Sequence, residues 1–232
     1  MIYYLSEDQL GFPPPHFADE DTGILAVGGD LSVDRLLLAY STGIFPWYDE
    51  DATPILWHAP AQRMVLTPSG VHIGRTLRKW IKKKQYAITY DLAFPDVLKH
   101  CANTPRPDQA GTWLNQSLQE ALCTLHSLGY AHSVEAWLNG ELVGGLYGLT
   151  IGGVFFGESM FSLADNASKV AFVTLCKALN QFGYALIDCQ VHTPYLESLG
   201  GFEVDRELFT ALLADGVQTI PRSVWPMTNQ EY

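Results

Sequence analysis

The chain lacks the features that mark several large classes of protein. No apolar run approaches the roughly 20 residues that a membrane-spanning helix needs. The first residues, MIYYLSEDQLGF, have neither the basic segment nor the long apolar segment of a signal peptide. No CxxC pair, HExxH or other metal-ligand spacing occurs among the four cysteines and seven histidines. We therefore expect a soluble, cytoplasmic protein that has no metal site and makes no contact with a membrane.

Nucleotide-binding and hydrolase motifs are missing as well. The sequence contains neither GxGxxG nor GxxxxGK[ST], the glycine-rich loops that bring backbone N–H groups to phosphates. It also lacks the GxSxG turn that exposes a nucleophilic serine. We expect no bound cofactor.

Basic residues are scarce and unevenly placed. The formal net charge of −11 argues against nonspecific nucleic-acid binding over the whole surface. Yet six of the fourteen Lys and Arg residues lie in RTLRKWIKKK: Arg75, Arg78, Lys79, Lys82, Lys83 and Lys84. Because charges are screened beyond about 8 Å at physiological salt, this stretch can act as a local basic patch. A solvated helix face is the alternative interpretation.

The pattern of apolar residues changes near residue 62. Before it, the chain is predicted to be loosely organised, with a helix capped by Ser32 and a loop of exposed aromatics at IFPWYDED. After it, the periodicities predict β-α-β-α-α, a three-strand meander and then α-β-α-β-α. Asn139-Gly140 predicts a type I′ hairpin turn, and Asn115 and Asn166 predict helix caps. The fold class is therefore α/β (α+β) with a mixed sheet, a small N-terminal domain over residues 1–62 and a larger domain over residues 63–232.

Two clusters combine polar groups with apolar surroundings. In YALIDCQV, strand alternation predicts Asp188 and Gln190 on one face and Cys189 on the other, among core residues. A buried carboxylate is normally paired, protonated or functional, although it can also cap a nearby helix. In GESMFS, Glu158 lies between aromatic and Met residues, where it could bind a cation or a hydroxyl group, or serve as a structural hydrogen-bonded Glu.

A family resemblance rests on eight motifs in order. They are GGDLS (28–32), LLLAYSTGIFPW (36–47), GTW (111–113), ELVGGLYG (141–148), GESMFS (157–162), NASK (166–169), LIDCQ (186–190) and SLG (198–200). Together they resemble the bacterial leucyl/phenylalanyl-tRNA–protein transferases, over about residues 2–226. The resemblance implies a catalytic C-terminal domain with a GNAT-like acyltransferase fold. It also implies transfer of Leu or Phe, and less well Met, from aminoacyl-tRNA to proteins with N-terminal Arg or Lys, which creates a degradation signal of the N-end rule pathway.

The resemblance also implies roles for individual residues. Asp188 and Gln190 match the pair at the reaction centre, which holds and could deprotonate the acceptor amine. Glu158 matches a position beside the aminoacyl end. The pocket for the amino-acid side chain and terminal adenosine is matched by Trp47, Trp113, Leu146, Phe155, Met160, Phe172, Leu179 and Ile187. Leu146 and Leu179 replace Met and Phe of a known member. The basic stretch is the expected contact for the acceptor stem of Leu-tRNA and Phe-tRNA.

Three alternatives stay open on the sequence. An acyl-CoA-dependent N-acetyltransferase of the same fold is one, although GESMFSLADNASK lacks the glycine pair that would hold pyrophosphate. A non-catalytic tRNA-binding module is the second, and it gives Asp188 and Gln190 no purpose. A hydrolase with a cysteine nucleophile is the third.

Overall fold

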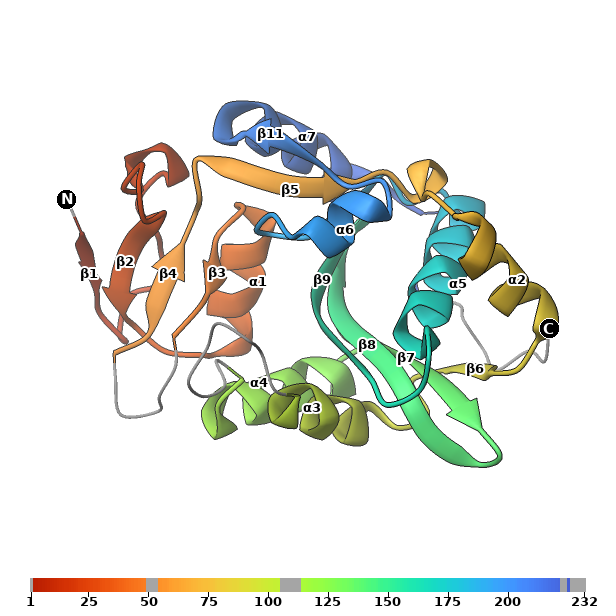
Figure 1. Cartoon of the computed structure of the whole chain (residues 1–232). Coiled ribbons are helices and arrows are strands. Elements are labelled where there is room, and N and C mark those ends of the chain that lie inside the picture. The colour runs from red at the N-terminus through yellow and green to blue at the C-terminus, as the bar shows by residue number, and fades with distance from the viewer. Residues whose placement is uncertain (1, 49–53, 105–113, 222–224, 226–232) are drawn as a thin grey trace.

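The computed structural model of the protein describes residues 2–48, 54–104, 114–221 and 225. Two sheets organise the described chain (Figure 1), a four-stranded sheet of early residues and a seven-stranded sheet of later ones. In these residues no helix is both long and apolar enough to cross a membrane.

The seven-stranded sheet is mixed. Its order is β11-β5-β10-β9-β8-β7-β6. The bounds are Phe202–Asp205, Gln62–Leu66, Leu186–Asp188, Val154–Ser162, Glu141–Ile151, Ala131–Leu138 and Ala87–Tyr90, in that order. Strands β6 to β9 form an antiparallel meander, whereas β10 runs parallel to β9. A meander followed by a helix and a parallel strand is the GNAT-like order that the resemblance implies, and the predicted mixed-sheet α/β fold is confirmed.

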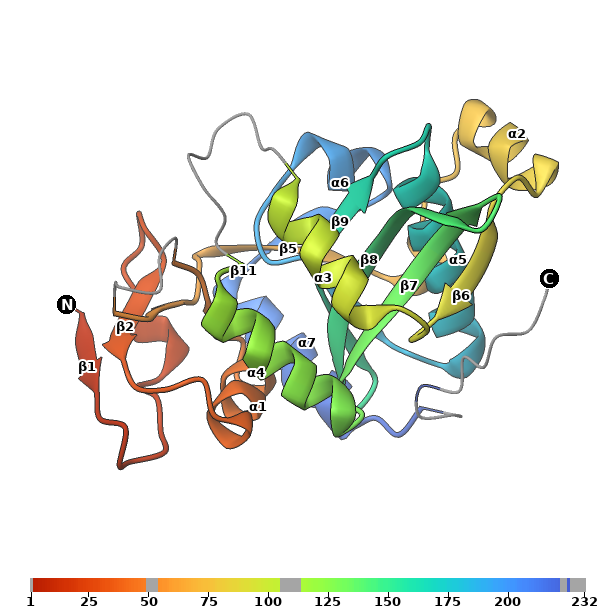
Figure 2. The same ribbon diagram turned by 90° about the horizontal axis from the view of Figure 1, so that it is seen from below.

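Helices cover both faces of this sheet. They are α2 (Arg75–Lys83), α3 (Phe94–Asn103), α4 (Gln116–Ser127), α5 (Ala167–Phe182), α6 (Pro194–Ser198) and α7 (Arg206–Gln218). Helix α5 buries its apolar residues in one cluster with β5, β8 and β9, whereas α3, α4 and α7 contribute to a second cluster on the opposite face. Figure 2 shows α3 and α4 side by side across the meander and α2 at the far end of the molecule. Two 3-10 helices, Pro15–Phe17 and Pro68–Gly70, complete the helical elements described.

Local sequence signals explain several element ends. Asn139 and Gly140 have φ of 53° and 84°, as a type I′ turn between β7 and β8 requires. The Asn115 side chain accepts a hydrogen bond from Leu118 N and caps α4, as predicted. The expectation for Asn166 is half right, because Asn166 precedes α5 but has φ of 61° and its side chain forms no capping bond.

The four-stranded sheet makes the N-terminal region more regular than the sequence predicted. Its order is β1-β2-β4-β3, with bounds Tyr3–Leu5, Ile24–Gly28, Leu56–His58 and Phe45–Pro46, and α1 spans Val33–Ser41. The expectation of exposed aromatics at IFPWYDED is wrong, because Phe45 is buried in β3 and Trp47 is half-buried against His58. The chain passes from one sheet to the other between β4 and β5, and the domain boundary at residue 62 stays a prediction.

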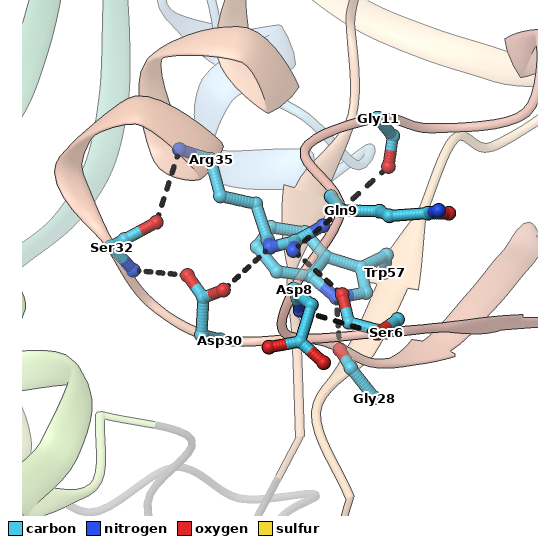
Figure 3. Close-up of polar contacts among 9 residues, drawn as sticks. All are labelled: Ser6, Asp8, Gln9, Gly11, Gly28, Asp30, Ser32, Arg35 and Trp57. Carbon is cyan, nitrogen blue, oxygen red and sulfur yellow. Dashed lines mark hydrogen bonds and ion pairs between the residues drawn. The ribbon is translucent and has the colours of Figure 1, made fainter.

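A buried arginine fastens the loops of this region (Figure 3). Arg35 Nη2 donates to the carbonyl oxygens of Ser6 at 2.8 Å and Gln9 at 3.0 Å. Its Nε donates to Asp30 Oδ2 at 3.1 Å. The same aspartate accepts a bond from the backbone N–H of Ser32, whose side chain caps α1. This network holds the chain before β2 against the start of α1.

Candidate active site

The site begins with a buried ion pair at the end of β10. Arg63, on the neighbouring strand β5, donates from Nε to Asp188 Oδ1 at 2.8 Å and from Nη2 to Asp188 Oδ2 at 2.6 Å. Both side chains are withdrawn from solvent, with 1 % and 0 % of their surface exposed. A bidentate pair of this kind fixes both the position and the plane of the carboxylate. Our sequence-based predictions did not single out Arg63, whose partner is 125 residues away along the chain.

Gln190 lies next to this carboxylate, but not in the way that strand alternation predicted. The strand ends at Asp188, and Gln190 adopts φ of 58°, so the two residues do not share a strand face. Instead, the backbone N–H of Gln190 donates to Asp188 Oδ1 at 3.0 Å. Its side-chain Nε2 donates to Glu158 Oε1 at 3.2 Å. Arg63, Asp188, Gln190 and Glu158 therefore form one continuous hydrogen-bonded chain.

Glu158 is an unusual acid at the far end of this chain. Burial raises its pKa to about 8, and the negative charge of Asp188 acts in the same direction. The Tyr40 hydroxyl and the Arg63 guanidinium act in the opposite direction without cancelling the effect. At neutral pH the carboxyl group is mostly protonated. It can then both donate and accept a hydrogen bond.

The raised pKa of Glu158 makes stability depend on pH. Between about pH 5 and 8 the folded protein keeps a proton that the unfolded chain, with a carboxyl pKa near 4.3, has lost. Because the folded state then binds more protons, this group lowers stability as pH rises through that window. We expect Tm to fall more steeply from pH 5 to 8 in the wild type than in Glu158→Gln, measured by thermal unfolding. The exposed Glu207→Gln is the control, and equal slopes in all three proteins would contradict the expectation.

Most of the predicted pocket residues lie together in the cluster between the sheet and α5. Ile187 pairs with Phe155 in the parallel ladder, and Leu146 pairs with Met160 across β8 and β9. Phe172 and Leu179 project from α5 into the same cluster. All of them are buried except Met160, which is partly exposed. The cluster thus brings together six of the eight predicted pocket residues.

Trp47, one of the two predicted tryptophans, is not in this cluster. Trp47 packs against the opposite cluster, with its ring centroid 5.5 Å from that of His58. Burial lowers the pKa of His58 to about 4, so its imidazole is neutral. Trp113 falls outside the described residues.

Cys189 has the core position that the sequence predicted. It is buried, belongs to the apolar cluster under α5 and is a free thiol. Burial raises its pKa, and the charge of Asp188 raises it further. Because the thiolate is the nucleophilic form, these surroundings disfavour a cysteine-nucleophile mechanism.

The basic stretch forms an exposed helix. Helix α2 turns Leu77, Trp80 and Ile81 towards the protein, whereas its cationic side chains are exposed. Lys84 ends the helix in a left-handed conformation with φ of 49°. Within the described part of the chain, none of the six predicted cations forms an ion pair with a carboxylate. Their charges therefore remain available to a polyanion.

Two further features lie away from the polar chain. A cavity of about 450 Å³ opens at the start of α5 and is lined in part by Ser162, Lys169 and Tyr195. Asp91, His126 and His132 come together near β7, but the Nδ1 atoms of the two histidines lie 2.8 Å from oxygens of Ala131 and Asp91. These hydrogen bonds account for the close approach of the three side chains.

Family models and individual related sequences point to the same protein family. Residues 65–214 match the family described as leucyl/phenylalanyl-tRNA protein transferase, and residues 29–61 match the N-terminal domain of the same family. A protein named leucyl/phenylalanyl-tRNA–protein transferase from Myxococcus xanthus is 52% identical over 214 residues, which cover 92% of this chain and 91% of that protein. One with the same name from Teredinibacter turnerae is 51% identical over 223 residues, covering 96% and 86% of the two chains.

Solved structures show a more distant likeness. L-PGS from Bacillus licheniformis has a TM-score of 0.40 and 11% identity, with 73% of this chain and 54% of that chain covered. A GCN5-related N-acetyltransferase from Kribbella flavida has a TM-score of 0.35 and 11% identity, with 69% and 56% covered.

Proposed function

Because the chain belongs to the leucyl/phenylalanyl-tRNA–protein transferase family and is thus an aminoacyltransferase that acts from tRNA to protein, we propose that its donors are Leu-tRNA and Phe-tRNA, with Met-tRNA used less well. The acceptors are proteins with an N-terminal Arg or Lys. The reaction takes place in the cytoplasm and marks the product for degradation by the N-end rule pathway. The observation that best supports this proposal is the polar chain from Arg63 to Glu158 beside an apolar cluster.

The reaction centre consists of Gln190 and Glu158. Asp188 supports it by accepting a hydrogen bond from the backbone N–H of Gln190. The acceptor α-amine attacks the carbonyl carbon of the ester, the new C–N bond forms, and the bond to the ribose oxygen breaks. One amine proton must be removed, and the ribose oxygen must gain one. Since the ester is already activated, holding the amine in line with the carbonyl supplies much of the rate. The Gln190 amide is placed to do this because its side chain is fixed by Glu158.

Asp188 orients the site, and Glu158 handles the proton. The Asp188 carboxylate already accepts three hydrogen bonds and is fully buried, which leaves little capacity to bind a substrate amine. Glu158, with its pKa raised to about 8, matches the α-amino group, whose usual pKa is about 7.7–8.0. A matched pKa allows proton exchange in either direction without a large free-energy cost.

The apolar cluster under α5 accepts the side chain of the transferred residue. Apolar surroundings suited to Leu, Phe or Met are formed by Leu146, Phe155, Met160, Phe172, Leu179 and Ile187, of which Met160 is partly exposed. Trp47 and Trp113 are the candidates for stacking on the terminal adenosine. Discrimination between similar apolar side chains is worth only about 1–3 kcal/mol, so leucine at positions 146 and 179 changes the preference order more readily than the substrate class.

Helix α2 binds the acceptor stem of the tRNA. Replacing Lys82, Lys83 and Lys84 by glutamate should weaken binding of Phe-tRNA at least about 10-fold, and the slope of log Kd against log salt should fall by about 0.9 for each lost phosphate contact. Both effects can be measured by filter binding at several salt concentrations. The charge-matched comparison is Lys82→Glu/Lys83→Glu against Lys99→Glu/Lys177→Glu, on α3 and α5. Equal losses in the two double variants would exclude α2 as the tRNA contact.

A direct transfer assay tests the proposed function. The protein is incubated with Leu-tRNA or Phe-tRNA and a peptide that begins with Arg, and mass spectrometry detects one added residue. A peptide that begins with an acidic residue is the control. Transfer to both peptides, or to neither, would refute the acceptor specificity. Calorimetry with acetyl-CoA tests the competing N-acetyltransferase interpretation, which predicts tight binding.

A further inference from the structure

We propose that Arg63 is a positioning residue for aminoacyl transfer, because it holds Asp188 and thereby the turn that presents Gln190. The proposal rests on the proposed function, which places Gln190 at the reaction centre. Arg63 itself is buried and touches no reacting atom in this assignment. Its effect on the reaction passes through Asp188.

The guanidinium of Arg63 is clamped from two sides. Its Cζ atom lies 4.5 Å from the ring centroid of Phe45 and 4.6 Å from that of Phe209. Phe45 belongs to β3 of the N-terminal sheet, and Phe209 belongs to α7. Two rings and a bidentate carboxylate leave the guanidinium little freedom to move. The position of Asp188 is thus set by elements from both ends of the chain.

A hydrogen bond from Gln190 to the fixed Asp188 carboxylate then holds Gln190 in position. Asp188 Oδ1 accepts both from Arg63 Nε and from the backbone N–H of Gln190, at 2.8 and 3.0 Å. Gln190 needs that support because φ of 58° is unfavourable for a residue with a side chain. A carboxylate that bonds the N–H two residues on is a common way to stabilise such a turn. If Asp188 shifts, the Gln190 side chain is displaced and its hydrogen bond to Glu158 is lost.

The pair is poorly explained by stability alone. Buried ion pairs are often no more stabilising than apolar residues of the same volume. Moreover, Nη1 of Arg63 is buried without a hydrogen-bond partner among the described residues, which is unfavourable. Arg35 is a useful contrast, because that buried arginine joins an aspartate to several backbone carbonyls and so fastens loops (Figure 3). Arg63, in contrast, donates both of its hydrogen bonds to one carboxylate, that of Asp188.

The test compares Arg63→Met and Arg63→Lys with the wild type in single-turnover transfer from Phe-tRNA to an Arg-peptide. Rates are normalised to the folded fraction. Since a small misplacement in a site can reduce rate by up to about 100-fold, Arg63→Met should lower kcat by about 10- to 100-fold, with KM for Phe-tRNA changed by less than about 2-fold. Arg63→Lys keeps the positive charge but loses the bidentate guanidinium. Its kcat should therefore lie between that of the wild type and that of Arg63→Met. Arg35→Met, the matched control, should lower Tm and leave kcat per folded molecule unchanged.

A double-mutant cycle separates this inference from the proposed function. If Arg63 acts through Asp188, Arg63→Met/Asp188→Asn should be no slower than the slower single variant. Full kcat in folded Arg63→Met, with a loss in Asp188→Asn, overturns the inference and leaves the proposed function standing. Full kcat in both Asp188→Asn and Gln190→Asn refutes the proposed reaction centre. If Arg63→Met does not fold, Arg63→Lys decides, and an unchanged kcat there also overturns the inference.

Discussion

Shortening Gln190 to asparagine should lower kcat for aminoacyl transfer by about 100- to 1,000-fold, the usual loss when one preorganised hydrogen-bonding group is removed from a reaction centre. Asparagine keeps the amide and tolerates φ of 58° better than most residues, so the backbone turn survives. Its side chain is one methylene shorter and cannot span the 3.2 Å contact to Glu158 Oε1. The loss therefore reports on the position of the amide and not on folding. Single-turnover transfer from Phe-tRNA to an Arg-peptide measures it.

Gln119→Asn is the matched control for this experiment. Gln119 is a half-buried glutamine whose Nε2, like that of the buried Gln190, donates one hydrogen bond, here to the carbonyl oxygen of Leu114 at 2.9 Å, but it lies on α4. Its shortening should leave kcat within about 2-fold of the wild type, as expected for a substitution away from the site. If Gln190→Asn retained both its kcat and its Tm, Gln190 would have no part in the reaction.

The sequence predicted the members of the polar site better than their arrangement. Asp188 and Gln190 were identified, but strand alternation placed them on one face, whereas the strand ends at Asp188 and the chain turns. That turn depends on a hydrogen bond from the Gln190 N–H to a carboxylate held by a residue on another strand. The one available signal for Arg63 was an arginine directly before the apolar run MVL in the strand QRMVL, where its charge would need a buried partner.

In the fold as well, features set by neighbouring residues were predicted, whereas features set by residues distant in sequence were not. The β7–β8 turn and the caps at Ser32 and Asn115 were predictable because each depends on residues within three positions of it. The N-terminal sheet was missed because its strands are two to five residues long and two of its three pairings join segments far apart in sequence. Such pairing is decided by tertiary packing, which outweighs intrinsic strand propensity.

The charge distribution gains a physical interpretation from the structure. Helix α2 exposes its cations at one end of an otherwise acidic molecule (Figure 2). In the proposed function, the tRNA needs a local cationic surface, whereas an acceptor with an N-terminal Arg or Lys would be attracted by negative charge. Placing the two signs in separate regions would then let one small protein attract both proposed substrates without neutralising either surface.

Replacing Gly148 by alanine should lower the free energy of unfolding by about 3–5 kcal/mol, at the upper end of single-residue effects. A Cβ atom at this position would lie within 2.2 Å of the Phe156 carbonyl oxygen and 2.6 Å of Phe155 Cζ. The register of β8 and β9 shifts at Gly148, so the two backbones approach each other here. Because the obstacle is backbone on the paired strand, a side-chain rotation cannot relieve it. A 232-residue chain should lose roughly 6–20 °C in Tm.

Gly157, the residue paired with Gly148, provides the matched control. A Cβ atom there would lie 3.6 Å from Phe155 and 3.7 Å from the Asp188 carbonyl oxygen, which are ordinary van der Waals distances. Gly157→Ala should therefore change the unfolding free energy by less than about 1 kcal/mol, as measured by urea denaturation. Similar losses in the two variants would show that the glycines of ELVGGLYG and GESMFS do not act through close backbone approach. A large loss only in Gly148→Ala would explain why a residue without a side chain occurs at this register shift, where β9 must be set for Phe155 and Glu158 to reach the site.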